Sequence, residues 1–247
     1  MLKERSDNLK YIEIDKSKIK KLYSDGVESN IYLYNLDGQT VLLKLLKDKS
    51  SLKNKEKKVN IIIDSDILKD EVNILASASI NGQFVGYFMP LDLEYTKTVS
   101  DFDKKRVKIS ALKQLRDKME RFNKNGIYIG DFNEKNILID KENNIKLCDL
   151  DNFKINDLDF DTPSTFVHYF RRNCKNEEKV DNYCFNLFTI SLMEKIYSPY
   201  VLNYLTSNPL PRYMDSKENR KIVDKLVFLD DSYQKKYIID NLTSKRM

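Results

Sequence analysis

The sequence holds a single histidine, His168, among its 247 residues. Zinc and iron sites that are built from several histidines are therefore excluded. The three cysteines form no Cys-x-x-Cys pair, and such a sparse, odd set fits a reducing compartment better than a disulfide scaffold. Only six glycines and five prolines occur, so collagen-like and linker-rich architectures are excluded as well.

Long apolar segments are also lacking. No run approaches the roughly 20 residues that a membrane-spanning helix needs, and the charged start of the chain has no apolar core of a secretion signal. We therefore expect a cytoplasmic protein without a membrane partner. The 43 basic and 38 acidic residues leave a net charge of only +5, which permits anionic ligands such as nucleotides without indicating direct nucleic-acid binding.

The chain contains enough apolar residues to form a hydrophobic core. Apolar residues make up 41% of the chain, and its 15 tyrosines and 12 phenylalanines need burial, which argues against extended disorder. The length suffices for one large domain or for two lobes. The 33% of charged residues predicts a well-solvated surface.

The first ninety residues read mainly as strands. The β-rich runs 31–34 and 41–46 flank an Asp-Gly pair, and the runs 73–80 and 83–89 flank an Asn-Gly pair. Both dipeptides are strong signals for two-residue hairpin turns. The stretch 50–63 between the hairpins has no glycine or proline and is expected to form one helix.

The pattern becomes helical from Asp101 onward. Four apolar residues at helical spacing predict one buried face, namely Leu112, Leu115, Met119 and Phe122. A hairpin is expected from 137–139 and 145–148, followed by a buried helix over 180–197. Residues 199–247 look helical with proline breaks.

The strongest chemical pattern is Gly-Asp-Phe-Asn-Glu-Lys-Asn at 130–136. Asp131 and Asn136 lie five positions apart in a loop that leads into a strand, and Asp149 follows the next strand. Phosphoryl transfer needs a carboxylate near the attacking hydroxyl, and an amide oxygen with a second carboxylate to hold Mg²⁺ on the phosphates. A hairpin would place Asn136 and Asp149 at its two ends, which suits a shared Mg²⁺ or Mn²⁺ ion.

These residues resemble those of the protein kinase-like superfamily. Segment 130–136 is similar to the catalytic loop H-R-D-x-x-x-x-N, with Ile-Gly in place of His-Arg. The Asp-Leu-Asp at 149–151 occupies the Asp-Phe-Gly position and departs from it at two residues. Upstream, 24–31 is similar to the glycine-rich loop G-x-G-x-x-G-x-V but keeps only Gly26, and it precedes a strand that carries Lys44, as in the V-A-I-K pattern.

A narrower resemblance is to a group of bacterial Ser/Thr protein kinases that are often fused to helix-hairpin-helix modules. Segments 26–32, 82–90 and 130–153 resemble that group's G-E-G-G-E-G-x-V-Y, F-V-G-F-x-M-P and D-x-D-S-F patterns. The resemblance implies an α+β, two-lobed protein kinase-like fold. The β-rich N-lobe, 1–90, would hold the nucleotide-binding strands and one helix, and the helical C-lobe, 91–247, would hold the catalytic loop and the metal-binding hairpin.

The resemblance also implies an ATP-dependent phosphotransferase, with a Ser/Thr protein kinase acting on a protein hydroxyl as the leading interpretation. Lys44 would hold the α- and β-phosphates, and Asp131 would orient the attacking hydroxyl and accept its proton. Asn136 and Asp149 would bind Mg²⁺. Asn133 replaces the lysine that protein kinases carry two residues after the catalytic aspartate, so a positive charge near the γ-phosphate is lost.

Further roles follow from the same resemblance. The expected carboxylate partner of Lys44 is Glu56 in the predicted helix, rather than Glu71, which abuts a strand. Asp181 resembles the kinase aspartate that caps the catalytic-loop backbone, and 152–180 is the expected activation and substrate loop. The residues expected to line the nucleotide are Ser24, Gly26, Ser29, Ile31, Leu42, Lys44, Met89, Leu91, Leu138 and Cys148.

Alternative functions stay open at this point. A small-molecule kinase of the aminoglycoside or choline type would share the fold and the Gly-Asp-x-x-x-x-Asn pattern. A pseudokinase would bind the nucleotide without turnover, although the four expected phosphotransfer residues are retained. A phosphotransferase that serves as a toxin or effector is a third alternative.

Overall fold

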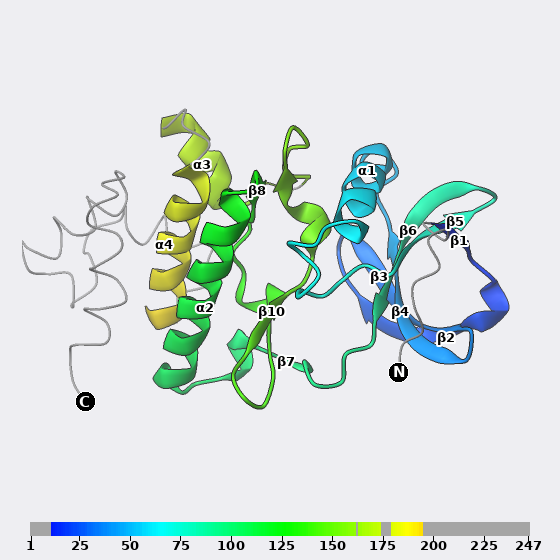
Figure 1. Cartoon of the computed structure of the whole chain (residues 1–247), viewed down its shortest axis with the longest axis horizontal. Helices are drawn as coiled ribbons and strands as arrows, with labels where there is room; N and C mark the ends of the chain where they lie inside the picture. The colour runs from blue at the N-terminus through cyan, green and yellow to red at the C-terminus, as the bar shows by residue number, and fades with distance from the viewer. Residues whose placement is uncertain (1–10, 162, 174–178, 195–247) are drawn as a thin grey trace, which may run out of the picture. The chain divides into compact units, whose positions relative to one another are not determined.

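The computed structural model shows a mixed α+β fold, as the sequence predicts, with strands dominating the first part of the chain and helices the second (Figure 1). The residues that it describes are 11–161, 163–173 and 179–194. The helices expected over 199–247 lie outside these residues. None of the helices in the described residues combines the length and the hydrophobicity needed to cross a membrane.

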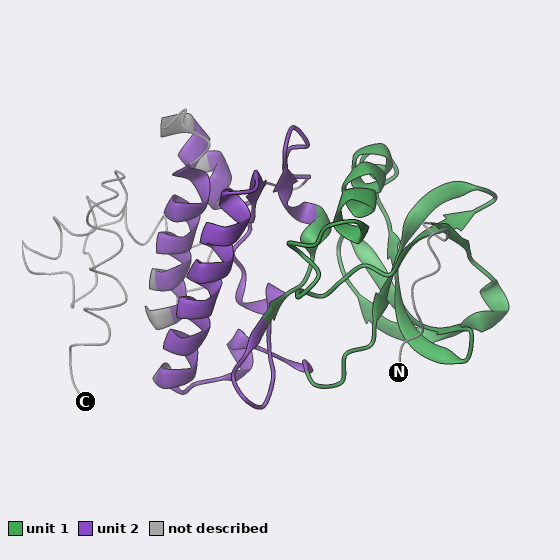
Figure 2. Cartoon of the chain, in the orientation of Figure 1, with its two compact units in different colours: residues 1–94, 146–151 green, residues 95–145, 152–247 purple. Residues whose placement is uncertain are grey.

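The chain divides into two compact units (Figure 2). The first unit comprises Met1–Glu94 and Lys146–Asp151, and the second comprises Tyr95–Ile145 and Asn152–Met247. The two contiguous lobes expected from the sequence differ from this division, because a six-residue segment from the second half of the chain belongs to the first unit.

A six-stranded sheet forms the body of the first unit, in the order β1-β5-β6-β4-β3-β2. Its strands are β1 (Tyr11–Glu13), β2 (Ile19–Asp25), β3 (Ser29–Leu36), β4 (Gln39–Leu46), β5 (Ala76–Ile80) and β6 (Gln83–Pro90). Both predicted hairpins are confirmed, and their Asp37-Gly38 and Asn81-Gly82 turns have positive φ at both positions, as tight hairpin turns require. β1 was not predicted; it pairs with β5 in parallel.

The two faces of this sheet differ in chemistry. Directly opposed residues of antiparallel strands share a face. Lys44 on β4 lies opposite Ile31 and Tyr87, and Leu42, two positions along β4, lies opposite Met89. These five side chains therefore share one face. The other face carries the apolar core, formed by Tyr34, Val41, Leu43, Ala76, Ala78 and Phe88.

The predicted helix is confirmed as α1 (Leu52–Ile63) and packs on the face that carries Lys44. Its buried residues follow helical spacing, and they are Lys55, Lys58, Val59 and Ile62. Ser77 on β5, which lies opposite Tyr87, donates a hydrogen bond to Asn60 of α1 at 3.2 Å. The helix therefore turns two lysines toward the same face of the sheet as Lys44.

Helices dominate the second unit. In the described residues of this unit they are α2 (Lys105–Asn123), α3 (Thr165–Asn173) and α4 (Val180–Glu194). Two short elements precede α2, namely β7 (Lys97–Thr98) and the 3-10 helix η2 (Val99–Asp101). Between α2 and α3 lie β8 (Ile127–Tyr128), the 3-10 helix η3 (Glu134–Asn136), β9 (Ile137–Ile139) and β11 (Lys154–Ile155). Two further elements contain the sequence boundaries between the units, namely β10 (Ile145–Leu147) and the 3-10 helix η4 (Leu150–Asn152).

The predicted buried face of α2 is confirmed, because its four apolar residues are each at most 2% exposed. The segment 152–180, expected as the activation and substrate loop, contains β11 and α3. The amphipathic pattern Thr-Phe-Val-His-Tyr-Phe at 165–170 buries Phe166, Val167 and Phe170, which supplies the apolar face that α3 needs.

Candidate functional site

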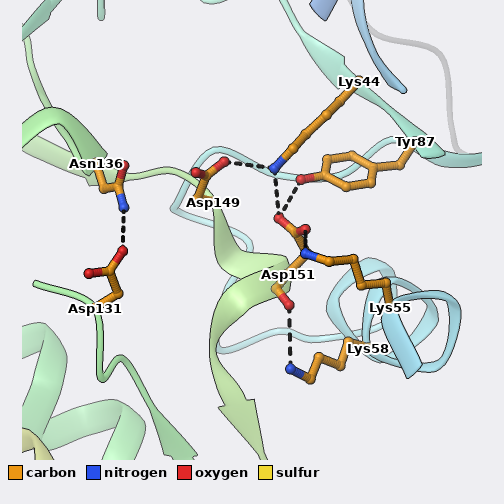
Figure 3. Close-up of polar contacts among 8 residues, drawn as sticks. All are labelled: Lys44, Lys55, Lys58, Tyr87, Asp131, Asn136, Asp149 and Asp151. Atoms are coloured by element: carbon orange, nitrogen blue, oxygen red, sulfur yellow. Dashed lines mark hydrogen bonds and ion pairs between the residues drawn. The ribbon is translucent and has the colours of Figure 1, made fainter. Parts of the chain in front are cut away.

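The loop between β8 and β9, in the second unit, carries the predicted catalytic aspartate. Asn136 Nδ2 donates to Asp131 Oδ2 at 3.5 Å, so the structure brings these two predicted residues together (Figure 3). Asn133 caps η3, and its side-chain oxygen accepts from the backbone N–H of Lys135 at 3.0 Å. Asn133 is therefore held by its own turn and adds no positive charge beside Asp131.

The backbone ahead of Asp131 is fixed by a buried carboxylate. Asp181 on α4 accepts hydrogen bonds from the backbone N–H groups of Ile129 at 2.9 Å and Gly130 at 2.8 Å, which confirms the expected cap. Burial raises the pKa of Asp181 to about 7, although the two N–H donors act to lower it. Gly130 has a φ of +65°, and a Cβ there would lie 2.3 Å from the ring of Phe160, so any other residue would be strained and would displace that ring.

In the first unit, Lys44 contacts two carboxylates (Figure 3). Its Nζ lies 2.8 Å from Asp149 Oδ1 and 3.0 Å from Asp151 Oδ1. Burial acts to lower the pKa of Lys44, but Asp151, Tyr87 and Asp149 together raise it well above its ordinary value. Lys44 is therefore a fixed cation, and its side chain is only 4% exposed, whereas that of Asp149 is 40% exposed.

Asp151 is fully buried and its carboxylate is surrounded by donors (Figure 3). Tyr87 donates its hydroxyl to Oδ1 at 2.5 Å, and Lys55 Nζ lies 2.7 Å from Oδ2. Lys58 Nζ donates to the backbone carbonyl of Asp151 at 3.4 Å. Burial acts to raise the pKa of Asp151, but the charges of Lys44 and Lys55 hold it well below its usual range. The group is therefore an ionised centre with cations from two elements, β4 and α1.

The predicted pairing of Lys44 with Glu56 is not formed, and the structure corrects it. Glu56 lies on α1 as expected, but its Oε1 accepts from the hydroxyl of Tyr11 at 3.0 Å. Successive residues of a helix are about 100° apart around its axis. Because Lys55 faces Asp151, its neighbour Glu56 is turned away from that group.

Sequence reasoning missed Asp151. The sequence did contain one indication of its importance: Asp151 is the third residue of Asp-Leu-Asp, where the Asp-Phe-Gly pattern has a glycine. The rejected candidate, Glu71, is buried elsewhere in the first unit, and its Oε2 accepts from the backbone N–H of Leu147 at 2.8 Å. It anchors the strand that leads to Asp149.

The predicted glycine-loop region is a tight turn between β2 and β3. The Gly26 N–H donates to the Ser29 carbonyl at 2.9 Å, and Lys47 Nζ donates to the Gly26 carbonyl at 2.7 Å. Lys47 also pairs with Asp25 at 2.7 Å. Ser24 is exposed on β2, whereas Ser29 is buried at the start of β3. The turn is therefore closed by its own backbone and by a lysine.

Of the predicted nucleotide-lining apolar residues, three share the sheet face of Lys44, as set out above. Leu91 is half-buried just after β6, and Leu138 is half-buried on β9 in the second unit, opposite Thr98. Cys148 directly precedes Asp149, and burial raises the pKa of its thiol to about 12. That thiol therefore stays protonated and is a packing group rather than a nucleophile.

The two predicted metal ligands offer an amide oxygen and a carboxylate, the hard donors that Mg²⁺ prefers. Asn136 belongs to the second unit and Asp149 to the first. Within the described residues, no three His, Cys, Asp or Glu side chains gather as a metal-binding group.

Comparisons with known proteins assign this chain to no family. No protein-family model matches the chain, and no curated protein matches it. Two groups of side chains carry the candidate chemistry, one around Lys44 and Asp151 and one around Asp131.

Proposed function

We propose that this protein is an ATP-dependent phosphotransferase with a two-lobed protein kinase-like fold, and that it acts as a Ser/Thr protein kinase. One observation carries the proposal: Lys44 and Asp149, 105 positions apart in sequence, form an ion pair at 2.8 Å. A phosphate-binding lysine and a metal-binding carboxylate must be neighbours in a phosphotransfer site. The Asp131–Asn136 contact supports the same interpretation, because both residue types are needed in the catalytic loop.

The proposed roles follow from the chemistry of each group. Lys44 binds and orients the α- and β-phosphates of ATP, and Asp131 orients the acceptor hydroxyl. The hydroxyl oxygen bonds to the γ-phosphorus as the bond from the γ-phosphorus to the bridging oxygen breaks, so that ADP leaves. The hydroxyl proton passes to Asp131. A Mg²⁺ ion, held by Asn136 and Asp149, would neutralise phosphate charge.

The backbone supports this assignment of Asp131. The general base must keep a fixed position relative to the acceptor hydroxyl, because small misplacements cost much of the rate. The hydrogen bonds from Ile129 and Gly130 to buried Asp181 hold the two residues before Asp131. This arrangement favours a working catalytic loop over a degenerate one.

The test is transfer of label from γ-labelled ATP with Mg²⁺ or Mn²⁺ present. We expect autophosphorylation or phosphorylation of an added protein, and a loss of about 10²–10⁴ in rate in Asp131→Ala, because the general base is removed. Asp66→Ala is the control, since the Asp66 side chain is 95% exposed in the first unit. An unchanged rate in Asp131→Ala would show that its assigned role is wrong.

The same assay distinguishes the alternatives. Label that moves only to an added aminoglycoside or choline would identify a small-molecule kinase. Thermal stabilisation by ATP without any transfer would identify a pseudokinase. Neither outcome is favoured by a particular contact in the described residues.

A further inference from the structure

We propose that Asp151 is the positioning residue for Lys44, in the place that the sequence suggested for Glu56; this inference rests on the proposed phosphotransferase function. The orienting carboxylate then comes from the turn that follows Asp149, and the helix α1 supplies cations to that carboxylate instead of supplying the carboxylate itself.

The two carboxylates at Lys44 differ in what else they bind. Asp149 is 40% exposed, and among the described residues its side chain bonds only to Lys44. Asp151 is 0% exposed, and both of its oxygens are occupied, by Lys44 and Tyr87 on one side and by Lys55 on the other. If Asp149 binds a metal ion, Lys44 loses one of its two carboxylate partners. Asp151 is still bonded to Lys44 and keeps the lysine in position.

The backbone explains how one short segment delivers both carboxylates. Asp149 has a φ of +59°, in the left-handed region that non-glycine residues seldom adopt. The chain then enters η4, which carries Asp151. Both side chains reach Lys44 from this turn. The position of the proposed phosphate-binding lysine is thereby coupled to the segment that bears the proposed metal ligand.

The two lysines around Asp151 allow its role in orienting Lys44 to be separated from its role in stability. Lys44 Nζ and Lys55 Nζ approach the carboxylate at 3.0 Å and 2.7 Å (Figure 3). Removing the carboxylate leaves two buried cations facing each other, which is unfavourable whether or not Asp151 has a role in catalysis. A second substitution at Lys55 relieves this repulsion. The residue introduced there determines whether Lys44 regains a second anionic partner beside Asp149.

The experiment measures kcat and KM for Mg·ATP in purified full-length variants, with thermal unfolding as a control for folding. Asp151→Asn should lower kcat by about 10²-fold, because Lys44 loses its fixed orientation, while KM changes much less. Adding Lys55→Glu, which returns a carboxylate from α1, should recover kcat by about tenfold. Adding Lys55→Met instead should recover thermal stability without recovering kcat.

A matched single-site control is Asp66→Asn, the same substitution at a carboxylate of the same unit whose side chain is 95% exposed. It should retain the kcat of the wild type. Equal recovery of kcat by Lys55→Met and Lys55→Glu would show that Asp151 is merely structural and would overturn the inference, as would wild-type kcat in Asp151→Asn. No phosphate transfer and no ATP binding by the wild type would instead overturn the proposed function itself.

Discussion

At the scale of single residues, two buried aspartates are stabilised by different partners. A buried carboxylate is costly unless its charge is matched or its oxygens are hydrogen-bonded. Asp151 lies between the lysines at 44 and 55, so its charge is balanced. Asp181 accepts two backbone N–H groups and has no lysine or arginine within ion-pair distance among the described residues. Its pKa consequently rises, whereas that of Asp151 falls.

The raised pKa of Asp181 predicts a pH effect on stability. With a folded pKa of about 7 and an unfolded value near ~4, the folded protein binds more protons between these two pH values. The free energy of unfolding therefore falls as pH rises through this window. Asp181→Asn cannot lose a proton, so its stability relative to the wild type should increase by about 3 kcal/mol from pH 5 to pH 8.

Urea unfolding across that pH range is the measurement. Asp159→Asn is the control; burial acts to raise the pKa of Asp159, but its hydrogen bonds with Arg171 lower it, so it titrates below the window. A stability difference between Asp181→Asn and the wild type that does not change with pH would contradict the assignment.

At the scale of secondary structure elements, the close approach of β4 and β6 places Lys44 beside Tyr87. Gly86 makes this approach feasible, because a Cβ at that position would lie 1.9 Å from the backbone carbonyl oxygen of Lys44. Backbone atoms in the middle of a sheet cannot move aside as a flexible side chain can. The position of Lys44 therefore depends on a glycine that pairs with Leu45 and Ala78.

Gly86→Ala should reduce the free energy of unfolding by about 3 kcal/mol or more, because the new methyl group clashes with backbone. Hydrogen exchange should also become faster in β4 and β6. Gly82→Ala is the control, since nothing lies within 4 Å of its Cβ and only its φ of +73° is unfavourable, which costs about 1 kcal/mol. Equal losses in the two variants would refute the steric argument.

At the scale of the whole molecule, the first compact unit is assembled from two separate stretches of chain. Lys146–Asp151 returns to the unit that begins at the N-terminus. Leu147 exchanges backbone and side-chain hydrogen bonds with Val72 and Glu71, which fixes the returning strand. The proposed function requires this return, because it brings Asp149 to Lys44.

Binding of Mg·ATP should therefore stabilise the chain. A ligand that binds only the folded state at 100 times its Kd adds about 2.7 kcal/mol to the free energy of unfolding, which corresponds to a rise in Tm of about 5–10 °C for a protein of this size. EDTA or Asp149→Asn should reduce the rise, because the metal or one of its proposed ligands is lost. If Mg·ATP leaves the Tm of the wild type unchanged, the protein does not bind the nucleotide, and the proposed function is contradicted.

Local chemistry determined much of the fold from the sequence alone. Asp-Gly and Asn-Gly pairs between β-rich runs specify hairpins, and apolar residues at helical spacing specify the buried face of α2. The Asp131–Asn136 contact could be predicted from the sequence because the two residues are only five positions apart in one loop. Asp181 was found only because a resemblance pointed to it, as no local pattern links it to Ile129 and Gly130.

The tertiary structure decided which carboxylate meets Lys44. That choice depends on a pairing across more than a hundred positions and on the rotation of α1, where one residue changes the direction of a side chain by about 100°. The sequence contained both Glu56 and Asp151, but only the packing of α1 on the sheet brings Lys55 to Asp151 and turns Glu56 toward Tyr11. Long-range packing sets such partners because buried charges must be matched in space, regardless of their order along the chain.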